Sequence, residues 1–149
     1  NRAGQPESVH TFGWYLRQII GETKAKGATP IVRSLIPRKS WDEAGQHINR
    51  AHDSFAGWAG QVARAENVGF IDLNELIARR LDVLGQEKVD LLYVPNPTPE
   101  KPKGETVHPG WDGAGLNAEV VVSGLKALKE NPVAAYFTAK AKDVAPAAP

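Results

Sequence analysis

The chain has 149 residues, a net charge of +1 and no cysteine or methionine. Its 42% hydrophobic and 23% charged content is typical of one globular domain, and no apolar run approaches the roughly 20 residues that a membrane-spanning helix needs. Without a dense basic cluster nucleic acid is a poor candidate partner, and without cysteine there is no disulfide, thiol nucleophile or cysteine-ligated metal.

Helical and extended segments alternate along the sequence. Apolar residues repeat every three to four positions in the expected helices, and β-branched residues cluster in two short runs that read as strands. In chain order we expect first a helix from Ser8 or Thr11 to about Lys26 with one face buried, then a strand at 29–36 and a loop at 38–46. A helix at about 47–66 and a strand at 68–73 follow. The last expected elements are a helix from Asp72 to about Leu84, a shorter helix at about 86–92 and a helix from Asp112 or Gly113 to about Glu130.

This alternation predicts a parallel sheet with helices on both faces, joined by right-handed crossovers. Two strands are too few for such a sheet, so we expect upstream sequence or a partner chain to complete it. Residues 94–104 contain four prolines and are expected to form an exposed, extended loop. Residues 143–149 are expected to be a flexible tail.

One short motif carries possible chemistry. Glu105 lies three residues before His108, just ahead of the last expected helix, on a loop that can turn into a cleft. A neutral imidazole can take a proton from a serine hydroxyl and return it to a leaving group, while a carboxylate orients the ring. The spacing alone is weak evidence, because a histidine on a loop is usually a solvated surface residue, and the catalytic interpretation depends on the neighbouring residues.

Those neighbours resemble the last sequence block of the SGNH, or GDSL-like, hydrolases. In that family Asp-x-x-His precedes a helix that begins Gly-Ala-x-x-Asn-Ala, and here Gly113–Ala118 lies at the matching distance. Further matches, to the rhamnogalacturonan acetylesterase branch, extend the resemblance in the same order over roughly residues 8–130. They are His10–Leu16, Lys24–Pro30, Pro37 and Arg38 with Trp41, and Phe70–Leu76.

The chain also departs from the family's pattern. Glu105 stands where the family usually has Asp, and the loop at 94–104 looks like an insertion directly before the motif. The family's nucleophile lies in a Gly-Asp-Ser block, and neither that block nor the blocks with the oxyanion donors occur here. The resemblance therefore implies a C-terminal portion of a longer enzyme, which is inactive alone because its nucleophile and N-terminal strands lie elsewhere.

Other polar residues have simpler explanations. His47 and His52 are five residues apart, which does not place them on one helix face, so we expect no metal site. Asp72 is expected to cap a helix together with Glu75 rather than to act as a catalytic acid.

Three residues are candidates for substrate binding. Arg38 and Trp41 follow the carboxyl end of the first expected strand, the edge at which open α/β sheets bind ligands. A sugar ring could stack on Trp41, and Arg38 could pair with a uronic carboxylate. Trp111 follows His108 by three residues and is expected to wall the same cleft.

By resemblance, the fold is expected to be a flavodoxin-like, three-layer α/β/α sandwich, with residues 1–142 as the C-terminal part of one SGNH hydrolase domain. The complete enzyme is expected to remove acetyl groups from pectic rhamnogalacturonan, with His108 as base and acid and Glu105 orienting it, and no cofactor is implied. Two alternatives stay open: an SGNH esterase or lipase with another acyl substrate, and a non-catalytic module that kept the fold. Family members are commonly exported, so a secreted or periplasmic location is expected.

Overall fold

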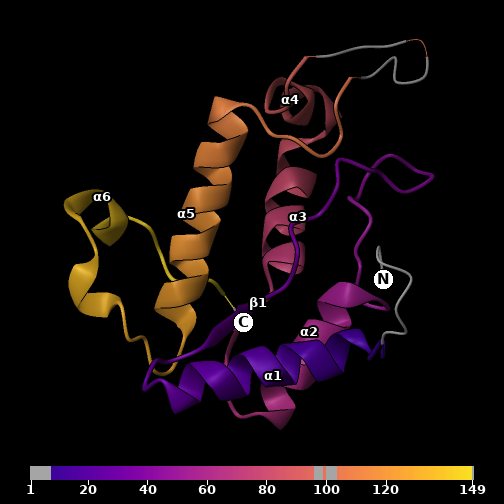
Figure 1. Ribbon diagram of the computed structural model, residues 1–149. Helices are drawn as coiled ribbons and strands as arrows, with labels where there is room; N and C mark the ends of the chain where they lie inside the picture. The colour runs from indigo at the N-terminus through magenta and orange to yellow at the C-terminus, as the bar shows by residue number, and fades with distance from the viewer. Residues whose placement is uncertain (1–7, 96–98, 100–103, 149) are drawn as a thin grey trace.

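The computed structural model describes residues 8–95, 99 and 104–148 (Figure 1). Over these residues the chain forms a two-stranded parallel sheet with helices packed on both faces. None of the helices in this part of the chain is both long and apolar enough to cross a membrane. In chain order the elements are α1 (Phe12–Ala25), β1 (Ile31–Arg33), α2 (Phe55–Ala65), β2 (Gly69–Ile71), α3 (Leu73–Leu84), α4 (Gln86–Leu91), α5 (Trp111–Ala127), the 3-10 helix η1 (Ala134–Tyr136) and α6 (Ala139–Lys142).

The sheet separates two hydrophobic cores. β1 and β2 pair in parallel with Ile31 opposite Gly69, and successive side chains point to opposite faces. Val32 and Phe70 pack with α1 and α2 on one face, whereas Ile31 and Ile71 pack with α3 and α5 on the other. This arrangement confirms the expected α/β class, with helices on either side of a parallel sheet.

Local signals set the ends of the helices. Thr11 caps α1, its hydroxyl oxygen accepting the Trp14 amide at 3.3 Å, and Gly27 follows the helix with a left-handed φ of 74°. The carboxylate of Asp72 accepts the Glu75 amide at 3.2 Å and caps α3, which confirms the predicted cap. The strands are shorter than the β-branched runs suggested.

The helix expected at 47–66 is wrong over its first part, because α2 begins only at Phe55. The preceding residues form a loop that is bound to α3. The Ile48 amide donates to Asp82 at 2.7 Å and the Ala51 amide donates to Asn74 at 2.8 Å. Side chains of α3 thus accept hydrogen bonds from backbone N–H groups of this loop and hold it against the helix.

The expected burial of one face of α1 is also wrong in part. Ile20 is buried, but Ile19 is 61% exposed and Tyr15 45% exposed. The exposed apolar residues of α1 lie next to those of α2. Phe55 of α2 packs edge-on against Phe12 of α1, with 5.4 Å between the ring centroids. The α1–α2 apolar surface comprises Phe12, Trp14, Tyr15, Ile19, Phe55 and Trp58.

This surface, together with the outer edge of β1, predicts self-association of the chain. No strand in the described part of the chain covers that edge, and exposed apolar patches beside open edges promote association. Sedimentation should show a mass that rises with concentration, and Ile19→Lys should reduce the effect. Val83→Lys, on α3 and 87% exposed in the parent chain, is the matched control and should not. A monodisperse monomer that unfolds cooperatively at every concentration would contradict the expectation.

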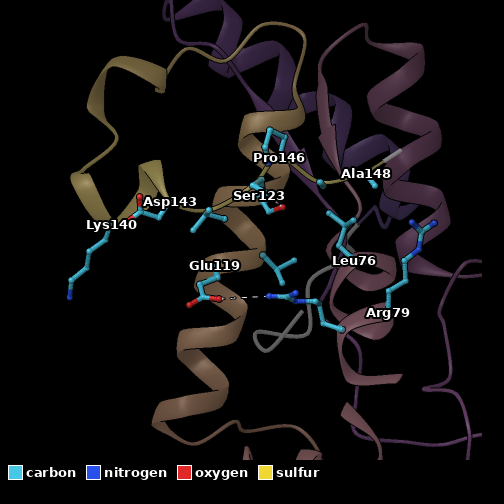
Figure 2. Close-up of a pocket in the computed structure, with 13 residues that line it drawn as sticks. Leu76, Arg79, Glu119, Ser123, Lys140, Asp143, Pro146 and Ala148 are labelled. Carbon is cyan, nitrogen blue, oxygen red and sulfur yellow. Dashed lines mark hydrogen bonds and ion pairs between the residues drawn. The ribbon is translucent and has the colours of Figure 1, made fainter. Parts of the chain in front are cut away.

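The segment expected to be a flexible tail, 143–149, crosses α5 at Ser123 and continues toward α3 over its described residues (Figure 2). The Ser123 hydroxyl donates to the Ala145 carbonyl at 2.8 Å, and the Ala147 amide donates to the Ser123 carbonyl at 3.0 Å. Between this segment, α5 and α3 lies a hollow of about 580 Å³, rimmed by the Arg80–Glu119 ion pair (Figure 2). The tail therefore forms one wall of a surface hollow.

Candidate active site

The start of α5 determines where the Glu105 motif lies. Leu128, just after α5, packs beside Gly69 at the start of β2, whereas Gly124 packs against Ile71 at its end. Helix α5 therefore runs antiparallel to β2, and its first turn extends beyond the carboxyl ends of the strands (Figure 1). The motif that precedes α5 lies on that side of the sheet, where open α/β folds bind their ligands.

Hydrogen bonds fix the backbone on both sides of the histidine. The Val94 amide donates to the His108 carbonyl at 3.3 Å, and the Gly110 amide donates to the Leu92 carbonyl at 2.8 Å. A Cβ atom at Gly113 would collide with that same Leu92 carbonyl oxygen. The first glycine of the Gly-Ala block is thus required by the close approach of α5 to residues 92–94.

The histidine and the carboxylate meet as the spacing suggested. Nδ1 of His108 lies 3.2 Å from Oε2 of Glu105. The other oxygen, Oε1, accepts the backbone amides of Thr106 at 2.8 Å and Val107 at 2.9 Å. The Glu105 side chain is only 15% exposed, whereas that of His108 is 75% exposed. A backbone-anchored carboxylate therefore orients an accessible imidazole, despite the extra methylene of Glu.

The three substrate-binding candidates lie differently. The Lys39 amide donates to the Thr106 carbonyl at 2.8 Å, which brings the backbone next to Arg38 alongside the motif. Arg38 is exposed, whereas Trp41 is half-buried against the core between α3 and α5. Trp111 is 92% exposed on the first turn of α5. The roles of Arg38, Trp41 and Trp111 stay predictions.

Ser34, at the carboxyl end of β1, has a structural role. Its hydroxyl is fully buried, donates to Asp72 at 2.8 Å and accepts the Asn74 amide at 2.8 Å. In the part of the chain that the structure describes, no serine hydroxyl is hydrogen-bonded to His108. Over the same residues no three His, Asp or Glu side chains gather as a metal site.

The hollows that lie beside α3 and α5 are not lined by the motif. The hollow in Figure 2 contains neither Glu105 nor His108. A groove of about 620 Å³ between α3 and α5 has Trp111, Leu84, Leu92 and Leu116 among its lining residues. Trp111, three residues after His108 in the chain, is thus the part of this groove that lies nearest in sequence to the motif.

One interaction at the site was not indicated by any sequence pattern. The buried ammonium of Lys39 forms an ion pair with Asp90 at 2.7 Å. Its side chain is 4% exposed although it lies in the polar run Arg38–Ser40. The two partners are far apart in sequence, so only the folded structure brings them together.

Comparison with known proteins places this geometry in a wider group. No family model and no curated protein matches the chain. A solved structure that does match is protein YxiM from Bacillus subtilis, with a TM-score of 0.65 and 27% identity. The fold is of the SGNH type. This likeness supports the broad resemblance seen in the sequence and does not distinguish among the branches of the SGNH group.

The alignment covers 77% of this chain but only 30% of the YxiM chain. The structural likeness therefore extends over about three quarters of this chain. The chain thus spans less than a third of the length of its structural neighbour.

Proposed function

We propose that the complete protein is an SGNH-type serine esterase and that this chain supplies its acid–base pair. The observation that carries the proposal is the 3.2 Å contact between Nδ1 of His108 and the anchored carboxylate of Glu105. Two further features support it. The pair lies beyond the carboxyl ends of a parallel sheet, and the fold is of the SGNH type. We infer that the nucleophilic serine comes from outside this chain, from a segment that also pairs with the open edge of β1.

The proposed reaction is serine acyl transfer. With Nδ1 turned to Glu105, Nε2 of His108 is the nitrogen that takes the proton from the serine hydroxyl as its oxygen attacks the ester carbonyl carbon. The tetrahedral intermediate collapses, the imidazolium gives its proton to the leaving alcohol, and an acyl-serine remains. Water, deprotonated by His108, then releases the acid and restores the serine. Glu105 keeps the ring in the required tautomer and stabilises the transient imidazolium.

We further propose acetyl esters on pectic polysaccharide as the substrate. Support comes from the sequence resemblance to the rhamnogalacturonan acetylesterase branch and from two exposed side chains near the motif. The ring of Trp111 is available for a sugar to stack on, and the exposed guanidinium of Arg38 suits a uronic carboxylate. Trp41 would contribute only the part of its ring that the core leaves open.

The test is to measure acetate release by the complete gene product from acetylated rhamnogalacturonan and p-nitrophenol release from p-nitrophenyl acetate. The proposal predicts hydrolysis of both, with the higher kcat/KM on the polysaccharide. Hydrolysis of p-nitrophenyl acetate alone would support the esterase function and contradict the proposed pectic substrate. If neither substrate is hydrolysed and a fluorophosphonate labels no serine, the chain belongs to a non-catalytic module and the proposal fails.

A further inference from the structure

Lys39 is an unusual lysine, because its charged end is buried beside the candidate site. The side chain is 4% exposed, and burying an ammonium group is costly unless it is paired. Its Nζ lies 2.7 Å from Oδ1 of Asp90 and 5.2 Å from the centre of the Tyr93 ring. An ion pair and a cation–π contact thus compensate the loss of hydration. Both partners belong to the segment at the end of α4.

Lys39 and Tyr93 are also joined to the two ends of the motif. The Lys39 amide donates to the carbonyl of Thr106, directly after Glu105. Tyr93 forms an antiparallel bridge with Pro109, directly after His108. The Lys39 ammonium thus joins residue 39 to the segment 90–93, and backbone contacts join both of these to residues 106–109.

We propose that Lys39 is a positioning residue for His108, which holds the Glu105–His108 contact in place through Asp90 and Tyr93. Its relevance to catalysis rests on the proposed esterase function. Lys39 does not act on the substrate. It keeps the loop rigid enough for Glu105 to hold Nδ1 of the histidine, because small displacements of a catalytic group cost large factors in rate.

The charge of Lys39, rather than its bulk, is what the proposal requires. Lys39→Met keeps most of the apolar stem but removes the ammonium, and Lys39→Arg keeps the positive charge. Lys24→Met is the matched control, because the Lys24 ammonium also makes a long-range contact, to the Glu66 carbonyl at 2.8 Å, but away from the motif. Asp90→Asn removes the partner charge at a half-exposed position, which a folded chain should tolerate.

The experiment measures the geometry of the pair directly in the chain. Nitrogen-15 shifts of the His108 ring at about pH 8.5, where imidazoles are neutral, report which nitrogen carries the proton. We expect the Nδ1–H tautomer to predominate in the parent chain and with Lys39→Arg and Lys24→Met. With Lys39→Met it should give way to the Nε2–H tautomer. In the same variant, Lys39→Met, the amide hydrogens of Thr106 and Val107 should exchange about 10-fold faster, because both N–H groups donate hydrogen bonds to Glu105.

The outcomes separate positioning from simple stabilisation. If Lys39→Met lowers the denaturation midpoint but leaves the His108 tautomer and the exchange of Thr106 and Val107 unchanged, the proposal is overturned. If Lys39→Met does not fold, Asp90→Asn must shift the same two readouts in the same direction, and unchanged readouts would overturn it equally. In the complete gene product, Lys39→Met should lower kcat about 10-fold with KM unchanged. If Lys39→Met alters the His108 tautomer and the amide exchange but the complete gene product has no esterase activity, the positioning role of Lys39 stands and only the proposed function is contradicted.

Discussion

Replacing His108 with alanine in the complete gene product is expected to lower kcat for ester hydrolysis by about 10²- to 10⁴-fold, the range that general acid–base groups contribute. The imidazole would both remove the serine proton and protonate the leaving alcohol, so both halves of the reaction slow. Glu105→Gln, which keeps the size but removes the charge, should cost on the order of 10²-fold or more. Initial rates of p-nitrophenyl acetate hydrolysis at about pH 7.5 measure the effects of both substitutions.

His52→Ala is the matched control, because His52 is another exposed histidine beside carboxylates. Its Nε2 lies 3.4 Å from Glu75 and 3.9 Å from Asp72, and its side chain is 50% exposed. We expect its rate to stay within about twofold of the parent, since surface substitutions away from a site have small effects. The double variant of His108 and Glu105 should be no slower than His108→Ala alone, because the carboxylate acts through the ring. Full activity in His108→Ala, or an equal loss of activity in His52→Ala, would contradict the role of His108 as general base and acid.

The features that the sequence predicted are those held by nearby residues. The Asp72 cap spans three positions, and so does the Glu105–His108 pair, so their geometry follows from local spacing once a helix start is located. Helix ends at glycine follow the same logic, because a left-handed φ is a local property. The alternation of helices and strands then fixes a parallel sheet, since right-handed crossovers leave few other topologies.

The features that escaped prediction depend on residues distant in the chain. Lys39 and Asp90 are 51 positions apart, and neither has a pattern that marks it as buried. Likewise, the loop before α2 is non-helical because Arg50 and its neighbours bind to Asp82, 32 positions away. The apolar periodicity predicted an apolar face on α1. It could not predict whether other residues of the described chain pack over that face, because such packing depends on the tertiary structure.

Arg50 is the centre of the network that holds this loop on α3. Its guanidinium donates to Glu75 at 3.1 Å, to Asp82 at 2.7 Å and to the Ile48 carbonyl at 2.6 Å. Burial opposes ionisation of Asp82, but hydrogen bonds from Arg50 and the Ile48 amide outweigh it and keep the pKa of Asp82 below its ordinary value. Burial likewise opposes ionisation of Glu75, where hydrogen bonds from Arg79 and Arg50 lower the pKa.

Arg50→Met is therefore expected to lower the free energy of unfolding at pH 7 by about 2–3 kcal/mol, since it leaves two poorly exposed carboxylates without their shared partner. Both carboxylates have a lower pKa in the folded chain than when unfolded. Their contribution is thus fully present above the unfolded values of about 4 and is lost as the pH falls through the folded values. Urea unfolding at about pH 7, 5 and 3 should show the gap between parent and variant narrowing in acid. Arg79→Met, which removes a half-exposed partner of Glu75, should cost only about 0.5 kcal/mol. A gap that stays constant down to pH 3, or an equal loss from Arg79→Met, would show that packing of the Arg50 stem, rather than its charge, holds the loop.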